Sequence, residues 1–277
     1  MPLVPTAQLI ERATARRRGV GAFNVLHLET AEALAGAAED AGHGLILQIS
    51  QNLVRFHGAL RPVASATMAV ASASSAPIAV HLDHAQDEDL VDEAIALGFG
   101  SVMYDGAALP YGENVAATRR VVARARAAGV FVEAELGEVG GKDGVHAPGA
   151  RTDPDEARGF VADTGVDALA VAVGSSHAMA TRTATLDIAL VADLADAVAP
   201  PLVLHGSSGV PDDQMVAAIR AGIRKVNVST HLNKAFTGGV RTCLAADAAV
   251  VDSRAYLGAG RAAMRDEAAR LLRLFAT

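Results

Sequence analysis

Short apolar runs rich in β-branched residues alternate with longer segments of helical periodicity along the whole chain. This alternation is typical of repeated βα units that build a parallel sheet. We count eight units, and the predicted strands are short and mostly apolar, as strands buried on both faces should be. They span residues 20–25, 45–49, 78–82, 101–104, 130–135, 168–173, 202–205 and 223–228.

The longer segments have the periodicity of amphipathic helices, for example residues 114–128 and 211–221. Glycines that suit a helix C-cap follow several such segments: Gly98, Gly129, Gly165 and Gly222. An open, doubly wound sheet would show the same alternation, but it usually carries a G-x-G-x-x-G turn after its first strand, and GAFNVLHLET has none. The pattern therefore favours a closed (β/α)8 TIM barrel. No linker, charge block or low-complexity tract interrupts residues 1–277, so we expect one domain.

Composition and charge narrow the functional class. The formal net charge of -7 argues against a nucleic-acid partner, which needs a basic face. The single cysteine, Cys243, excludes a disulfide framework and a thiolate zinc site, so any metal would be held by histidine and carboxylate. Residues 1–19 lack the apolar region of a signal peptide, and no run of about 18 apolar residues predicts a membrane span. We expect a cytoplasmic protein with no membrane partner.

Polar residues follow the predicted strands at the end where TIM barrels carry their chemistry, the carboxyl end. Every strand contributes at least one. In chain order they are Asn24, Ser50, Asp83 with His84, Asp105, Glu135, the segment from Gly174 to His177, His205 and Asn227.

Three of these residues are histidines that follow different strands: His84, His177 and His205. A single histidine is most often a solvated or hydrogen-bonded residue. These three have no close spacing in sequence, so only a fold in which strand ends converge would bring them together. Three neutral imidazoles with an open fourth position form the ligand set of a catalytic zinc ion. The other histidines are expected to be solvated in loops, namely His27, His43, His57 and His146, or, for His81, to support a ligand from inside its strand.

Carboxylates stand beside the proposed ligands. Asp83 directly precedes His84, where it could exchange a proton with a substrate that the metal polarises. It could instead cap a helix or orient a histidine. Glu135 and Asp105 could bind a second divalent cation, or could only anchor their strands through hydrogen bonds.

Two turns rich in glycine and serine lie next to two of the proposed ligands. They read V-G-S-S-H at residues 173–177 and H-G-S-S-G at residues 205–209, and the second leads into a helix that starts near Pro211. Backbone N–H groups in such turns and at helix N-termini bind phosphate. The position of both turns therefore predicts a phosphate site beside the metal.

These motifs resemble those of the class II fructose-bisphosphate and tagatose-bisphosphate aldolases. The resemblance runs through GAFNVLHLET, LILQIS, IAVHLDHAQ, SVMYDGAALPYGENV, VEAELGEVGG, ALAVAVGSSH, LVLHGSSGVPDDQM, GIRKVNVST and SRAYLGAGR. The order VHLDHA, VEAELG and LHGSSG is its most specific part.

The resemblance implies reversible cleavage of a ketose bisphosphate, fructose or tagatose 1,6-bisphosphate, to dihydroxyacetone phosphate and an aldehyde. Zinc would be held by the three histidines, with Asp83 as the acid/base. Glu135 and Asp105 would border an alternative metal position, and a monovalent cation, Na⁺ or K⁺, would support the phosphate loops. Residues implied to bind substrate or phosphate are Asn24, Ser50, Gly174, Gly206, Ser208, Asn227, Ser229 and Thr230. Arg254 would reach the distal phosphate across a subunit boundary, which implies a homodimer or homotetramer.

The chain departs from the family pattern at three places, all concerned with substrate or protons. The phosphate-facing lysine expected after His177 is absent, and Arg182 is the nearest cation. The acidic residue expected after the strand-eight N-x-x-T pattern is replaced by His231. The glutamate expected in the mobile loop is absent, and Asp143 or Glu138 could take its place. We infer that zinc-dependent chemistry is retained, and these departures leave a non-standard donor or aldehyde substrate open as an alternative.

The sequence is also compatible with two other functions. A class I aldolase would need a barrel lysine that forms a Schiff base, and among Lys142, Lys225 and Lys234 only Lys225 lies on a predicted strand. A non-catalytic sugar-phosphate binding protein is the second alternative, although binding alone would not require a carboxylate such as Asp83 beside the metal.

Overall fold

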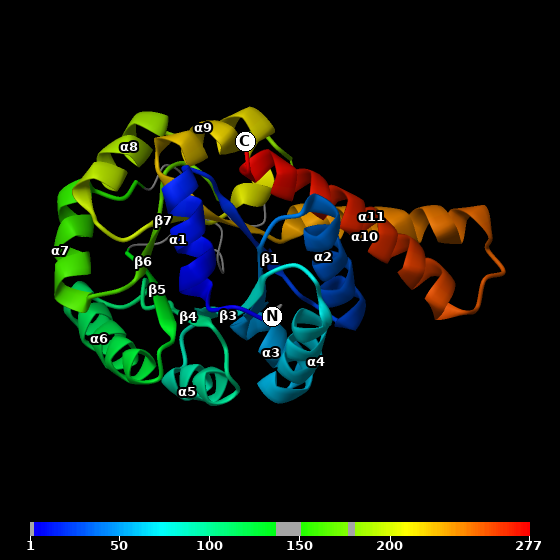
Figure 1. The fold of residues 1–277 in the computed structure, drawn as a ribbon, viewed down its shortest axis with the longest axis horizontal. Helices are drawn as coiled ribbons and strands as arrows, with labels where there is room; N and C mark the ends of the chain where they lie inside the picture. Colours follow the sequence, from blue (N-terminus) through cyan, green and yellow to red (C-terminus); the bar gives the residue numbers. More distant parts are fainter. Residues whose placement is uncertain (1–2, 137–150, 177–180) are drawn as a thin grey trace.

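Eight parallel strands close into a barrel in the order of the chain, as the sequence predicts (Figure 1). The computed structural model describes residues 3–136, 151–176 and 181–277. Strand β8 pairs with β1, with Lys225 opposite Val20, and this pairing closes the barrel. The strands are β1 (Val20–Asn24), β2 (Leu45–Ser50), β3 (Ile78–Ala85), β4 (Ser101–Tyr104), β5 (Phe131–Glu135), β6 (Ala168–Val171), β7 (Leu202–Leu204) and β8 (Ile223–Val228).

The eight predicted strands are all confirmed, with small differences at their ends. The largest difference is in β3, which continues through Asp83 and His84 to Ala85. Its pairing with β4 shifts register between Leu82 and Ala85. The strand therefore bulges where its polar residues lie.

Eleven α-helices lie in the described residues, most of them packed around the outside of the barrel (Figure 1). They are α1 (Thr6–Arg16), α2 (Leu28–Ala41), α3 (Gln51–His57), α4 (Leu60–Ala73), α5 (Glu88–Ala96), α6 (Tyr111–Ala127), α7 (Pro154–Thr164), α8 (Ile188–Ala197), α9 (Asp212–Ala221), α10 (Thr230–Ala246) and α11 (Ser253–Phe275). The glycines expected to end helices all have positive φ angles, namely Gly98, Gly129, Gly165 and Gly222. In this conformation a glycine carries no Cβ penalty.

The amino-terminal end of the barrel is closed by α1, which precedes the first strand and crosses the opening (Figure 1). Leu9 and Ile10 of α1 are buried with Val20, Ile46 and Ala79 from the first three strands. This apolar layer excludes water from the amino-terminal half of the barrel interior. The opposite, carboxyl end of the barrel is left to polar side chains.

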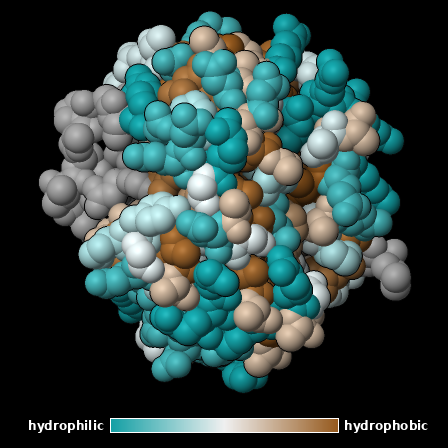
Figure 2. All heavy atoms as spheres, turned by 90° about the vertical axis from the view of Figure 1, so that its left-hand side faces the viewer, coloured by the Kyte–Doolittle hydropathy of each residue, from teal (hydrophilic) through white to brown (hydrophobic). Residues whose placement is uncertain are grey.

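One side of the barrel shows a predominantly polar surface. Figure 2 shows the side of the barrel on the left of Figure 1, where hydrophilic residues predominate and apolar residues are interspersed among them. A search of the described residues finds no helix with the length and apolar character that crossing a membrane requires.

Helices α10 and α11 form an antiparallel pair that extends beyond the barrel (Figure 1). We call this pair the arm. The helices approach closely because glycines lie between them. A Cβ added at Gly239 would lie 2.5 Å from the carbonyl oxygen of Ala259. The neighbouring Gly238 faces open space, with no atom within 4 Å of such a Cβ.

These two glycines allow a direct test of helix packing in the arm. Gly239→Ala should lower the free energy of unfolding by about 1–3 kcal/mol, because backbone atoms of α11 must move to admit the methyl group. Gly238→Ala is the matched control and should raise stability by about 0.5–1 kcal/mol, since alanine is the better helix former. Denaturant unfolding of both variants measures the difference. Equal effects would contradict the close approach of α10 and α11.

Candidate metal centre and active site

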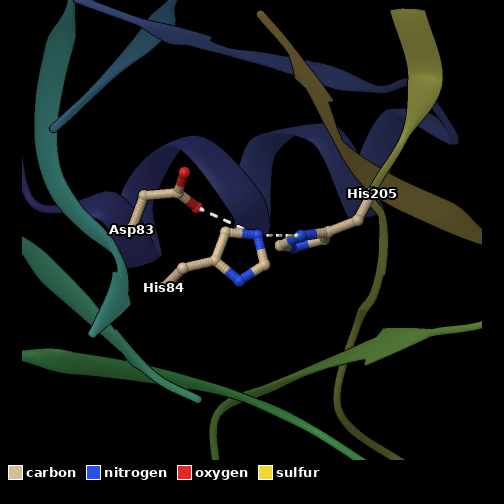
Figure 3. Close-up of side chains that lie close together, drawn as sticks. All are labelled: Asp83, His84 and His205. Carbon is tan, nitrogen blue, oxygen red and sulfur yellow. Dashed lines mark hydrogen bonds and ion pairs between the residues drawn. The ribbon is translucent and has the colours of Figure 1, made fainter. Parts of the chain in front are cut away.

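Two histidines and an aspartate converge at the carboxyl end of the barrel (Figure 3). Asp83 and His84 come from β3, and His205 directly follows β7. His84 Nε2 lies 2.9 Å from His205 Nδ1, and the two rings are nearly perpendicular at 86°. Asp83 Oδ1 lies 3.9 Å from His84 Nε2. The barrel therefore brings together residues that are 121 positions apart in the sequence.

The bulge in β3 explains how neighbouring residues reach the same space. In a regular strand Asp83 and His84 would point to opposite faces of the sheet. Here His84 has a φ of 50°, in the left-handed region, and the register of the pairing shifts beside it. A non-glycine residue held there costs about 1–2 kcal/mol. Packing elsewhere in the barrel sustains this strain, and strained backbone of this kind is often found at functional sites.

The orientation of His84 is set by a carboxylate on the next strand. Its Nδ1 lies 2.8 Å from Asp105 Oδ2 and 4.0 Å from Glu135 Oε2. An Nδ1–H donated to Asp105 leaves the lone pair of Nε2 directed toward His205. Carboxylate–histidine pairs of this kind fix the tautomer of metal ligands.

His205 is oriented in the same way by a residue that the sequence analysis missed, Glu133. His205 Nε2 lies 2.8 Å from Glu133 Oε1, and Lys225 Nζ lies 2.7 Å from Glu133 Oε2. All three side chains are buried inside the barrel. A signal was present in the sequence, because Glu133 is a charged residue in the middle of an apolar strand and shares a face with Glu135. Such residues are almost never buried without a partner.

The same ion pair bears on the Schiff-base alternative. Lys225 Nζ is engaged in a buried ion pair with Glu133, whereas a Schiff-base lysine must present its amine to the substrate. The geometry favours Lys225 as a structural cation.

Charges around the site decide the ionisation of Asp83. Burial opposes its ionisation, but the neighbouring His84, His205 and Lys225 outweigh burial and hold the pKa of Asp83 well below its usual range. Burial also lowers the pKa of His205, which favours the neutral imidazole that a metal requires. Burial and the charge of Lys225 lower the pKa of His81 to about 3. At neutral pH the site contains an anionic Asp83 and a neutral His81, and burial disfavours the protonated form of His205.

One oxygen of Asp83 is bound and the other is available. Asp83 Oδ2 accepts a hydrogen bond of 3.1 Å from the amide of Asn24, which accepts one of 3.0 Å from Gln48. Asp83 Oδ1 is buried and has no hydrogen-bond partner among the residues that the structure describes. A buried, ionised oxygen is costly unless a cation or a proton donor meets it.

The donor set fits a zinc ion. Ligand atoms of Asp83, His84 and His205 lie within 4.8 Å of one another. Tetrahedral zinc with bonds of about 2.0–2.1 Å would place two ligand nitrogens roughly 3.3 Å apart, so the histidines need to separate by only a few tenths of an ångström. His84, Asp105 and Glu135 form a second group with the same spacing. The third expected ligand, His177, lies outside the described residues.

The two glycine-serine turns lie beside this centre. Gly206, directly after His205, has a φ of 68°, and a Cβ there would lie 2.6 Å from the backbone of Ser176 in the other turn. The two turns therefore touch at a position where only glycine fits. Ser175 contributes a buried hydroxyl for which the described residues provide no hydrogen-bond partner. In the second turn Ser208 Oγ accepts a hydrogen bond of 3.1 Å from the amide of His231.

Other residues expected to bind substrate have contacts of their own in this structure. Ser50 caps α3 by accepting from the amide of Leu53, at 3.2 Å. The amide nitrogen of Asn227 lies 3.1 Å from His205 Nε2. The remaining members of this set are placed as follows: Gly174 has a φ of 114°, the amide of Ser229 lies 3.4 Å from Ser208 Oγ, and Thr230 begins α10.

Arg182 and His231, near the expected phosphate sites, both contact carboxylates. Arg182 donates to the carbonyl of Val210 and to Asp212, the latter at 2.5 Å. His231 Nε2 lies 2.5 Å from Glu267.

Arg254 is exposed and bound to Asp252 at the start of α11, in the arm that extends beyond the barrel (Figure 1). It does not join the site of its own chain. The loop candidates Asp143 and Glu138 lie outside the described residues.

Comparison with known proteins gives a consistent result. The family model of fructose-bisphosphate aldolase class II matches residues 4–277. A fructose-bisphosphate aldolase of Geobacillus stearothermophilus is 39% identical over 269 residues, which cover 96% of this chain and 94% of that protein. One from Giardia intestinalis is 37% identical over 292 residues, covering 96% and 90%.

Comparison with solved structures agrees with the family model and the sequence relatives. The YdjI aldolase from Escherichia coli K12 is 29% identical with a TM-score of 0.85, and the alignment covers 99% of this chain and 97% of that one. Fructose-bisphosphate aldolase from Campylobacter jejuni shares the fold, with a TM-score of 0.84 at 20% identity and 99% and 95% coverage. With a family model and relatives that span nearly its whole length, the chain belongs to the class II fructose-bisphosphate aldolases, a family of generally zinc-dependent lyases that cleave ketose bisphosphates.

Proposed function

We propose that this protein reversibly cleaves a ketose 1,6-bisphosphate, fructose or tagatose bisphosphate, into dihydroxyacetone phosphate and an aldehyde, with Asp83 as the group that moves the proton. The observation that carries the proposal is the state of Asp83. It is ionised and buried, and its Oδ1, which has no partner within the described part of the chain, lies beside two converging imidazole nitrogens. A carboxylate in this position can accept a proton from a substrate hydroxyl.

His84 Nε2 and His205 Nδ1 would hold the zinc ion, with His177 as the proposed third ligand. Bound zinc supplies Lewis-acid stabilisation of negative charge on the substrate oxygens. Asp105 and Glu133 keep the two imidazoles in the tautomer that presents a lone pair. The group of His84, Asp105 and Glu135 would serve as the second divalent position.

Proton transfer would use two groups. In cleavage, Asp83 Oδ1 would take the proton of the C4 hydroxyl as the bond between C3 and C4 breaks, and would return it in condensation. Asn24 holds Oδ2, so that Oδ1 keeps a fixed direction. Asp143 or Glu138 would exchange the proton at C3 of the donor.

Substrate phosphate would bind at the two contacting turns, through the amides of Gly174, Gly206 and Ser208 and of Ser229 and Thr230 at the start of α10. Na⁺ or K⁺ would lie beside these loops. Arg182 is the proposed replacement for the missing lysine, yet it would have to be shared with Asp212. Arg254, exposed on the arm, would complete the site of a neighbouring subunit in a homodimer or homotetramer. A donor or aldehyde other than the usual pair is the alternative that these substitutions favour.

Asp83→Ala tests the proton-transfer role. It should lower kcat by roughly 10²–10⁴-fold, the usual contribution of a general base, without changing zinc content. Turnover with each bisphosphate and metal analysis of the purified protein measure the two quantities. Asp92→Ala, which removes an exposed aspartate on α5, is the control and should leave both unchanged. Undiminished turnover in Asp83→Ala would refute the assignment.

Metal removal separates the zinc and Schiff-base mechanisms. Dialysis against a chelator should abolish cleavage, and added Zn²⁺ should restore it, because no lysine carries the reaction. Borohydride with substrate should leave the protein unmodified. Activity that survives chelation, or a reduced adduct on Lys225, would favour the class I mechanism.

Glu133→Gln tests whether this side chain positions His205. Zinc affinity should fall by roughly 10–100-fold, as for other groups that orient a ligand. Stability should also fall, by about 3–5 kcal/mol, because Lys225 is left buried without its partner. The double variant Glu133→Gln with Lys225→Met should regain stability and keep the weak zinc affinity. If the double variant also recovered normal zinc affinity, Glu133 would have only a structural role.

A further inference from the structure

A second concave site lies at the opposite end of the barrel from the metal centre. It is a cavity of about 160 Å³ between the last turn of α1, the starts of β1 and β2 and the end of α11. Buried Leu9 and Leu272 contribute to its floor. Arg12, Arg16 and Arg18 also line it, together with His43. We call this the basic pocket.

The basic pocket has no negative partner for its cations. None of the thirteen described residues that line it is an aspartate or glutamate. No described carboxylate forms an ion pair with Arg12, Arg16 or Arg18. Other arginine clusters of the described chain are paired with carboxylates, namely those of Arg120 with Arg124, Arg182 with Arg270, and Arg261 with Arg265.

This contrast is notable in a chain with 31 acidic and 24 basic residues. Like charges gathered in one cleft raise the local concentration of anions. The carboxyl end of α1 carries about half a negative charge, which a single arginine in its last turn would offset. The remaining guanidinium groups have no carboxylate partner in residues 3–136, 151–176 and 181–277.

The backbone arranges the arginines around the cavity. Arg17 follows α1 in the left-handed conformation, with a φ of 53°. Helices α2, α3 and α7 place glycine at the corresponding position. Because of this turn, Arg16 and Arg18, the residues before and after Arg17, line the same cavity. Arg17 itself lies near Arg224. The strain is tolerated although glycine would relieve it.

We propose that the basic pocket binds a small phosphate-bearing anion, either inorganic phosphate or a short phosphate monoester. The planar guanidinium group donates paired hydrogen bonds to phosphate oxygens, and two or three arginines suit a doubly charged group. The volume is below the roughly 300–1,000 Å³ of sites for drug-sized ligands, so a nucleotide would not be enclosed. The apolar floor provides room for a few carbon atoms.

His43 supplies a local reporter for binding. Burial and the charges of Arg18, Arg273 and Arg16 hold the pKa of His43 below its usual range. Asp40 and Glu39, the nearest acidic residues in sequence, are engaged by Arg265 and by Ser74 and Ser75. A bound phosphate would offset the arginine charges and raise the pKa of His43.

The experiment follows the ring resonances of His43 by NMR, assigned through His43→Asn, during titration with inorganic phosphate and separately with glycerol 3-phosphate. A saturable shift of the His43 signal is expected with one or both ligands. The ligand that binds more tightly shows whether the pocket takes inorganic phosphate or a phosphate monoester. Potassium chloride at the same ionic strength should not reproduce it. A signal that does not respond to millimolar phosphate or glycerol phosphate, or that responds equally to chloride, would overturn the proposal.

Two triple variants of equal charge change complete the test. Arg12→Gln, Arg16→Gln and Arg18→Gln together should weaken binding at His43 by roughly tenfold or more, because charge-assisted hydrogen bonds are lost. Arg61→Gln, Arg119→Gln and Arg220→Gln together, on α4, α6 and α9, should leave it unchanged. If both triple variants weakened binding equally, the effect would follow from the net charge of the protein alone, and the proposal of a specific site would be refuted. Neither set alters a residue of the metal centre.

Discussion

Pairing of β8 with β1 is the constraint on which the site depends. A parallel barrel sends the carboxyl ends of all its strands to one opening, so closure alone makes residues on β3 and β7 neighbours. Without it His84 and His205 would lie at separate places on an open sheet. Neither histidine forms a site by itself, because each would supply only one ligand of the proposed metal centre.

Closure also creates an interior that must be filled, and the two ends of this barrel are filled differently. Apolar residues of α1 and the first strands seal the amino-terminal end. Toward the other end the interior holds Glu133, Lys225 and His205, all buried. A buried ion pair contributes little net stability compared with apolar packing of the same volume. Its orienting effect on His205 gives a reason for this composition, because an apolar residue at position 133 could not hold a ring nitrogen.

The repeated apolar runs were sufficient to predict all eight strands, since short strands buried on both faces have few other interpretations. The convergence of Asp83, His84 and His205 followed from placing polar residues at strand ends. Glu133 was missed because its position inside a strand, two residues before Glu135, looks like part of the barrel wall. Its role depends on Lys225, 92 positions away, and that pairing is a property of the closed barrel. The bulge at His84 was equally hidden, because it requires the register of two strands.

Side chains at the carboxyl end of the barrel differ in how firmly they are held, and this difference bears on substrate choice. Asp83 and His84 are held by strand backbone and by Asn24 and Asp105, so a change of substrate need not disturb them. Arg182 lies instead after β6, and its hydrogen bonds run to Val210 and Asp212. An arginine already engaged by a carboxylate must exchange that partner for a phosphate, and the exchange reduces the net gain from binding. In the proposed function, proton transfer and phosphate recognition therefore rest on different residues, so the second can change while the first is kept.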